Sequence, residues 1–333
     1  MHVAGTPIWC DARRRRDICF LSAADRAGRT GHGQLIGTAL TLALIGVRDQ
    51  GHLAVPLRQR FTLGTVRLEL IPSGRGFGAA ALHADISGRT VLYAGQIRTS
   101  AGGVGDAAEV RASDAIVVAA PYGAPSDKFP PLAGAIADTV EWTRAQLAAD
   151  RRPALLVDSV LDGLEVASRL AAEDIPVAGG RALREAAQRI ADLVPGAQRI
   201  DGSIEIGSSV RPRTSAPATA SGVPPIPAPG REPRAIVWLD ADRAGLARAL
   251  GDRSHVAALV SARAHGGSAG YAKGFVWSSA ADRAQLLGWI EATGARDIYV
   301  TGGCAEAIVA ALGARARVIG PPHQMPLFPH EAA

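Results

Sequence analysis

Short apolar segments separated by turn residues fill the first third of the chain. In each segment apolar residues either run together or alternate with polar ones, and Gly, Ser and Pro lie between the segments. They are residues 17–23, 66–73, 80–87, 90–97 and 114–121. This pattern predicts β-strands joined by short turns. One helix is expected among them, at residues 34–46, after a Gly-rich loop.

From about residue 130 the apolar positions take on helical spacing. Helices are expected at residues 132–150, 163–173, 182–194 and 242–251, and strands at residues 153–160 and 235–240. Strands alternating with helices predict a parallel sheet with helices on its faces. Residues 209–234 are rich in Pro, Ala and Ser and show no period, which predicts a flexible loop.

The last part of the pattern is a strand, a loop, a helix and a second strand at residues 275–303. The second strand ends at Gly302 and Gly303, just before another helical segment. The N–H groups of such a turn can hold an anion, or the glycines merely permit a tight turn. Cys304 has the position of a nucleophile, but no histidine partner is evident in the sequence.

Composition limits the class of protein without choosing one. The 333 residues suffice for two domains or one large α/β domain, and 47% hydrophobic with 20% charged residues excludes wholesale disorder. A net charge of +5, carried almost wholly by Arg, permits nucleic-acid contact but equally fits a solvated surface. The same two interpretations apply to the run Arg13 to Arg16. Only 5% of residues are aromatic, so stacking platforms for single strands are few.

The sequence contains no apolar run of the roughly 18 residues that a membrane span needs. Its first residues lack the order of a signal peptide. The three cysteines form no CxxC pair and fit reduced thiols, so a cytoplasmic protein without membrane contact is expected.

Five segments follow one another in the order found in a known family. They are GHGQLIGTALTLAL (31–44), LIPSGRGFGAAAL (70–82), VLYAGQI (91–97), VVAAPYGAPSDKFPP (117–131) and the stretch at 275–303. Together they resemble the β-CASP branch of the metallo-β-lactamase fold. The resemblance is closest to bacterial ligase-associated DNA exonucleases and to proteins like the mRNA 3′-end processing factors.

The resemblance implies an α/β fold, a metallo-β-lactamase-like αββα sandwich with an inserted β-CASP α/β domain. Residues 1–123 would form the first part of the sandwich, 124–269 the insert and 270–320 the return to the sandwich. Residues 321–333 would form a C-terminal tail.

The family's metal ligands are missing. Its members hold two zinc ions with a histidine-rich cluster, further histidines and a bridging aspartate, and these ions activate water for phosphodiester cleavage. The matching positions here are Ala23, Asp25, Gly28, Arg75, Gln96, Ala119, Ala280 and Gly302. Ala and Gly offer zinc no ligand atom, and Arg repels a dication. We therefore expect no metal, no cofactor and no catalytic residue of the family's kind, and a guanidinium and an amide filling the vacated site.

Other candidate sites compete with this interpretation. Asp11, Asp25 and His32 are the nearby residues that could form a residual metal site, although each more simply reads as a polar loop residue. His83 lies on a strand in which apolar and polar residues alternate, and we interpret it as a structural or surface residue. The loop GHGQLIG (31–37) suggests a phosphate cradle, but its spacing is not that of GxGxxG.

A short motif near the C-terminus stands apart from the fold. Residues 324–328, QMPLF, resemble the pentapeptide with which bacterial proteins bind the sliding clamp. The interpretation requires Leu327 and Phe328 in an apolar pocket and Gln324 fixing the register, with Met325 following Gln324 in the motif. A tail packed on its own domain is the alternative.

The sequence thus predicts a non-catalytic homologue of β-CASP nucleases. It would act as a nucleic-acid-binding or scaffolding subunit in DNA repair or RNA processing, with Arg26 and Arg75 contacting DNA or RNA. Its expected partners are the nucleic acid, the sliding clamp, a DNA ligase or an active paralogue. The rivals are a hydrolase or exonuclease with an altered site and a regulatory partner of an active paralogue.

Overall fold

The computed structural model describes residues 1–28, 31–47, 51–100, 103–194, 200–201, 234–251 and 254–320. The chain divides into two compact units: unit 1 is Met1–Ala135 with Val276–Ala333, and unit 2 is Ile136–Phe275. The insert expected at 124–269 is thus offset from unit 2 by 12 residues at its start and 6 at its end. Apart from Arg234, the expected flexible loop lies outside the described residues, and so does the expected tail.

Unit 1 contains a seven-stranded mixed sheet in the order β17-β16-β9-β8-β7-β6-β5. Strands β5 to β8 are an antiparallel meander, and β8, β9, β16 and β17 pair in parallel. The strands are β5 (Arg60–Leu63), β6 (Val66–Pro72), β7 (Ala80–Ile86), β8 (Arg89–Gln96), β9 (Ala115–Ala119), β16 (Asp297–Thr301) and β17 (Ala316–Val318). The strands expected at residues 66–73, 80–87, 90–97 and 114–121 are confirmed.

A second sheet of unit 1 has four short parallel strands. They are β1 (Ile8–Cys10), β2 (Ile18–Phe20), β3 (Gln34–Gly37) and β4 (Leu53–Ala54). The helix expected at residues 34–46 was wrong in its first turn, because Gln34–Gly37 pairs with β2 and with β4. The helix α1 (Ala39–Leu44) begins only after Thr38, whose side chain accepts a hydrogen bond from Thr41 N.

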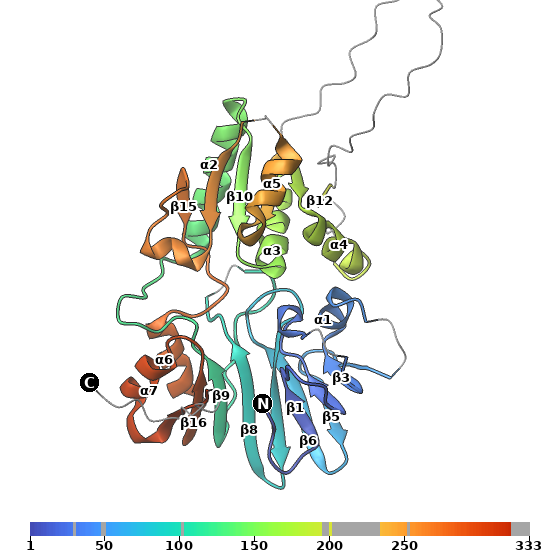
Figure 1. The fold of residues 1–333 in the computed structure, drawn as a ribbon. Helices are drawn as coiled ribbons and strands as arrows, with labels where there is room; N and C mark the ends of the chain where they lie inside the picture. Colours follow the sequence, from blue (N-terminus) through green and yellow to red (C-terminus); the bar gives the residue numbers. More distant parts are fainter. Residues whose placement is uncertain are drawn as a thin grey trace, which may run out of the picture. The chain divides into compact units, whose positions relative to one another are not determined.

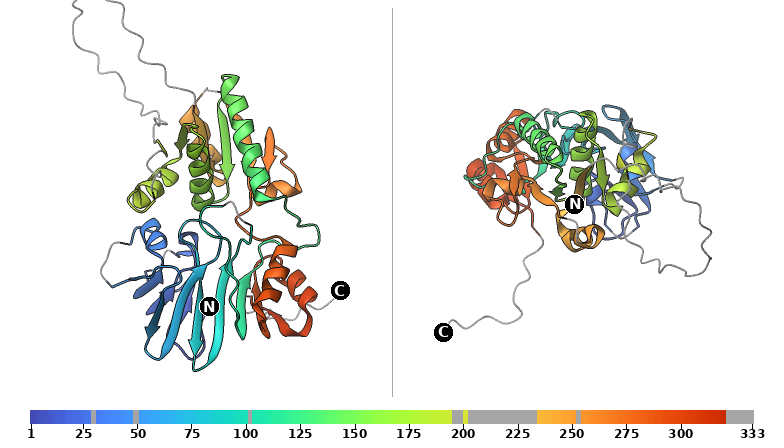
Figure 2. Two further views of the ribbon diagram at one scale, coloured as in Figure 1. Left: turned by 180° about the vertical axis from the view of Figure 1, so that it is seen from behind. Right: turned by 90° about the horizontal axis from the view of Figure 1, so that it is seen from above.

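Apolar clusters stack these elements into four layers. Residues of β1 to β3 share one buried cluster with β6, β7 and β8, so the two sheets pack face to face. The other face of the large sheet packs on α6 (Arg283–Thr293) and α7 (Ala305–Leu312), while α1 packs on the outer face of the small sheet. Figures 1 and 2 show α6 and α7 beside β9 and β16.

Unit 2 is built on a six-stranded sheet in which every pairing is parallel. The order is β12-β11-β13-β10-β14-β15. Its strands are β10 (Pro153–Val157), β11 (Val177–Gly179), β12 (Ile200–Asp201), β13 (Ala235–Leu239), β14 (Val256–Val260) and β15 (Lys273–Phe275). The parallel sheet expected from the alternation of strands and helices is confirmed.

Helices cover both faces of that sheet. They are α2 (Leu132–Ala148), which begins in unit 1, α3 (Val160–Ala172), α4 (Arg181–Ile190) and α5 (Arg243–Leu250). The helix α5 packs on Leu156, Ile236 and Trp238 of one face. Figures 1 and 2 show α3 and α4 on the opposite face.

These layers confirm a mixed α/β protein. Among the described residues, no helix combines the length and the apolar character that crossing a membrane requires.

The helix α6 begins with a capping box that ties it to a distant loop. Asp282 accepts from Gln285 N at 2.9 Å and from Phe129 N at 3.0 Å, and the Gln285 side chain bonds back to Asp282 N. Both carboxylate oxygens of this buried residue are therefore used.

We expect Asp282→Ala to lower the free energy of unfolding by about 2 kcal/mol, because the N–H groups of Phe129 and Gln285 both lose their acceptor. Asp282→Asn should cost clearly less, since Asn is also a good N-cap. Urea unfolding followed by tryptophan fluorescence measures both. Equal midpoints for the wild type and the Ala variant would contradict this role of the cap.

Candidate functional site

Five side chains from distant parts of unit 1 meet in one network, here called the Arg75 network. Arg75 forms an ion pair with Asp25 through Nη2 and donates from Nη1 to Ser279 Oγ at 2.7 Å. Gln96 donates from Nε2 to Ser279 O at 3.3 Å and accepts from Arg26 Nη2 at 3.0 Å. A guanidinium and an amide thus lie together around Ser279, and their filling of a former metal site stays a prediction.

Strand ends and turns bring the network together. Its members come from the turn η1 (Ala24–Arg26) after β2, the β6–β7 loop, the last residue of β8 and the loop before α6. Gly74 has a φ of +76°, and a Cβ there would lie 2.0 Å from Arg98 O. Only glycine can therefore make the turn that leads into Arg75.

Two members of the Arg75 network, Arg75 and Gln96, are buried. The Arg75 side chain is 7% exposed and that of Asp25 is 24% exposed. A guanidinium stays charged at any ordinary pH, so its burial requires a carboxylate and hydrogen-bond acceptors close by. Arg75 is thereby engaged inside the protein, and it does not offer its charge to a nucleic acid in the way expected of a contact residue. Arg26 is exposed and remains accessible.

The other positions matched to the family's ligands lie around the same strand ends. Ala119 ends β9, where it pairs with Gln96 on one side and Thr301 on the other. Ala280 is buried in the loop before α6, and the neighbouring Ala281 N donates to Ile97 O at 2.7 Å.

Two further positions flank η1. Ala23 is buried directly before the turn. Gly28 is exposed and lies beside the backbone of Arg13 instead of joining the network.

The zinc ions that the resemblance implies do not fit these residues. The Arg75 network offers two guanidinium groups, an amide and a hydroxyl, and its single carboxylate is already paired with Arg75. Over the described ranges, no three His, Cys, Asp or Glu side chains are grouped so as to hold a metal ion. Zinc requires imidazole, thiolate or carboxylate donors, and the ion pair of Arg75 with Asp25 leaves none of them available at this site.

Asp11 has a structural role. Its carboxylate accepts from Ser22 N at 2.8 Å, from Ser22 Oγ at 2.6 Å and from Tyr93 Oη at 2.9 Å. Burial raises the pKa of Asp11, although the hydrogen bonds from Ser22 and Tyr93 act in the opposite direction. Burial likewise raises the pKa of Tyr93 well above its usual value. This cluster joins β1, β2 and β8.

The remaining histidine and cysteine candidates lie apart from one another. His32 Nδ1 accepts from Arg16 N at 3.2 Å, and burial lowers the pKa of His32. His83 on β7 lies across from Glu69 of β6, and burial also lowers its pKa. Cys304 Sγ lies 3.7 Å from Pro121 O at the start of α7.

The run of arginines before β2 is largely exposed. Arg13, Arg14 and Arg15 face solvent, while the Arg16 guanidinium lies 3.5 Å from the centre of the Trp9 ring. The clamp-binding motif at Gln324, Met325, Leu327 and Phe328 lies outside the described residues.

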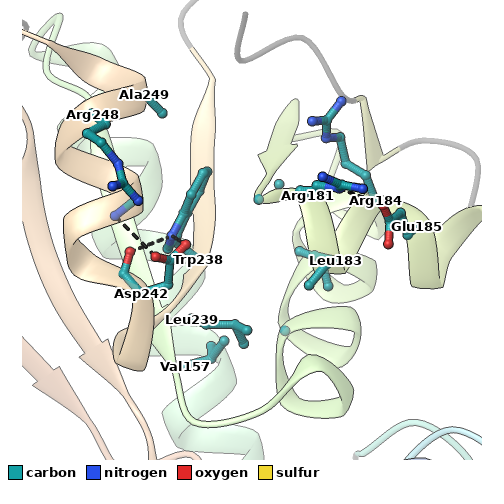
Figure 3. A pocket seen from close by; sticks show the side chains of 15 residues that line it. Val157, Arg181, Leu183, Arg184, Glu185, Trp238, Leu239, Asp242, Arg248 and Ala249 are labelled. Carbon is teal, nitrogen blue, oxygen red and sulfur yellow. Dashed lines mark hydrogen bonds and ion pairs between the residues drawn. The ribbon is translucent and has the colours of Figure 1, made fainter. Parts of the chain in front are cut away.

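A second site, in unit 2, was missed by the sequence analysis. It is a pocket of about 630 Å³ at the carboxyl ends of β10, β11 and β13, between α4 and α5 (Figure 3). Gly179 ends β11 and Gly180 is the N-cap of α4, and this Gly-Gly pair was the available signal. The helix was expected from the sequence, but the three-residue strand before it was not, so the turn could not be placed at the end of a strand.

Comparison of the chain with protein-family models found no match, and comparison with curated protein sequences found none.

The backbone at Gly302 excludes the histidine that the family carries there. Gly302 has a φ of +106°, and a Cβ would lie 2.8 Å from Ala120 O. Gly302→Ala should therefore lower the free energy of unfolding by about 2 kcal/mol. Gly303→Ala is the matched control, because a Cβ at Gly303 meets nothing within 4 Å. Chemical unfolding of the two variants compares them; similar losses would show that the Gly302 turn can adapt.

We expect Arg75→Ala to lower the free energy of unfolding by about 2 kcal/mol, because Asp25 and Ser279 lose a partner at a buried position. The control is Arg67→Ala, whose side chain is 79% exposed and 3.9 Å from Asp85. That change should cost less than about 0.5 kcal/mol. Thermal and urea unfolding test both variants, and an unchanged Arg75→Ala stability would remove the structural role.

Proposed function

We propose that the chain is a β-CASP member of the metallo-β-lactamase fold that has lost its metal site and acts as a non-catalytic nucleic-acid-binding or scaffolding subunit. The observation that carries the proposal is the Arg75 network. Positions matched to the family's ligands from the sequence alone, more than 200 residues apart in the chain, gather at one group of strand ends. Chance matches of unrelated segments would not be expected to converge in this way.

The chemistry of the network argues against the family's hydrolytic reaction in this chain. Cleavage in the family needs metal-activated water, and the acceptors that would bind a cation here are used by Arg75. Arg75 has a structural role in holding the loops and no role in a reaction. The proposed function of the chain is therefore binding. Work in DNA repair or RNA processing is part of the same proposal and rests on the resemblance.

Positive charge for a phosphate backbone comes from the exposed arginines of unit 1. Arg26 donates from one guanidinium nitrogen to Gln96, and the other nitrogens of this exposed residue remain available to a phosphate. Arg13 lies on a neighbouring loop, whose backbone touches Gly28, and Arg14 and Arg15 follow it. Guanidinium groups bind phosphate oxygens in pairs, so this surface suits a backbone contact without base reading.

We expect weak binding of single- or double-stranded oligonucleotides that is independent of sequence and falls steeply between roughly 50 and 200 mM salt, as counterion release requires. Arg14→Gln and Arg26→Gln should each weaken it and reduce the salt slope by about one. Arg67→Gln, at an exposed site on β6, is the control. Fluorescence anisotropy with labelled oligonucleotides gives all these values.

The outcomes separate the rival functions. If no binding is detected at the lower salt, only the protein-scaffold form of the proposal remains, with a clamp, a ligase or an active paralogue as partner. A nuclease activity with Mn²⁺ or Zn²⁺ that disappears in Gln96→Ala would overturn the proposal in favour of a hydrolase with an altered site.

A further inference from the structure

The unit 2 pocket lies where the connections of the parallel sheet change direction. From β11 the chain runs into α4 on one face of the sheet, and from the adjacent β13 it runs into α5 on the other face. The two helices therefore diverge and leave a crevice at the carboxyl ends of these strands. Open parallel sheets bind their ligands in such crevices.

The pocket has an apolar wall and a cationic rim. Its volume of about 630 Å³ lies within the range of small-molecule sites. The wall is formed by Val157, Leu183, Trp238 and Leu239. The rim carries Arg181 and Arg184 from α4 and Arg248 from α5, which stand on opposite sides of Trp238 in Figure 3.

Glycines shape the floor of the pocket. A Cβ at Gly180 would lie 3.1 Å from the Trp238 ring, so the indole packs directly on the backbone that leads into α4. Gly180 O accepts the first helical hydrogen bond of α4, from Arg184 N at 3.0 Å. The N–H groups of the preceding three residues are thus left without a helical acceptor.

The two carboxylates of the pocket are already engaged. Glu185 pairs with Arg181 at 2.7 Å. Asp242 accepts from Gly245 N at 3.1 Å and from the Trp238 indole N–H at 3.1 Å, as Figure 3 shows.

Two guanidinium groups of the rim lack a hydrogen-bond acceptor among the described residues: that of Arg184, which the nearby Glu185 carboxylate attracts, and that of the exposed Arg248. Within the described part of the chain, the side chains of Arg184 and Arg248 have no hydrogen bond or ion pair, and Arg184 Nε is buried. A buried guanidinium nitrogen without an acceptor is costly, and an anion in the pocket would supply one.

We propose that this pocket binds a small phosphomonoester, with the phosphate held by Arg184, Arg248 and the N–H groups at the start of α4. The organic part of the ligand packs on the apolar wall around Trp238. A phosphate suits the rim because it offers several charged acceptor oxygens to donors that come from two helices. The inference concerns unit 2 alone and does not depend on the proposed function of unit 1.

Isothermal titration calorimetry of the full chain with adenosine 5′-monophosphate, adenosine and inorganic phosphate tests the proposal. The monophosphate should bind more tightly than either fragment, because only it carries both the anion and the apolar body. Arg184→Gln and Arg248→Gln should each weaken binding about tenfold, the effect of losing one charge-assisted hydrogen bond. Arg189→Gln, on the same helix but outside the pocket, should leave binding unchanged.

The indole N–H resonance of Trp238 gives a second readout that a folding defect would not imitate. It should shift on addition of the monophosphate to the wild type, and the Arg184→Gln variant, whose folding is checked by its spectrum, should need about ten times more monophosphate for the same shift. A 5′-phosphorylated oligonucleotide that competes as strongly as the monophosphate would identify a strand end as the source of the phosphate. Absence of monophosphate binding, equal binding of adenosine, or binding unchanged in both arginine variants would overturn the proposal.

Discussion

A permanently charged guanidinium buried at the ends of strands governs the arrangement of unit 1. Arg75 cannot lose its proton, so its burial demands a carboxylate and neutral acceptors at fixed places. Asp25 and Ser279 meet that demand, and Gln96 holds Ser279 from the opposite side. Asp25 lies 50 residues from Arg75 in the chain and Ser279 lies 204 residues from it, so the buried charge holds together three distant segments. The loops around β2, β6, β8 and α6 all depend on this one buried charge.

The backbone around the network admits only small side chains at two positions. Gly302 turns the chain with a φ of +106° against Ala120 O, and buried Ala280 leaves little room for a larger group. Placing a metal ligand at Gly302 would therefore require more than exchanging side chains, because the Cβ of the ligand residue has no space there. A metal site also needs partners that orient its ligands, and the groups nearby are already bonded to Arg75 and Gln96.

The regular elements with a clear period were accessible from the sequence. The pattern at 66–97 predicted the three strands β6 to β8, although not their antiparallel pairing, and the Asp282 and Gln285 spacing agrees with the start of α6. The short strand β3 was missed because four residues are stabilised by their neighbours β2 and β4 and carry no period of their own. An ion pair such as Arg75 with Asp25 also leaves no local signal, since only the fold brings the two loops together. The unit 2 pocket depends on strand order, which no single segment encodes.

Arginine takes three different roles in this chain, and the partner available to each guanidinium decides which. At Arg75 the charge is compensated internally, so the residue stabilises the fold and has little to offer an outside anion. At Arg26 one nitrogen is held by Gln96 while the group stays exposed, where water and salt weaken any contact with phosphate. At Arg184 the group is partly buried beside an apolar wall, and the described residues supply no acceptor. An anion there would gain most, because the cost of removing the guanidinium from water has already been met by folding. The net charge of the chain therefore says little about where it binds anions. Guanidinium groups that are held in place and lack a hydrogen-bond acceptor are the better guide.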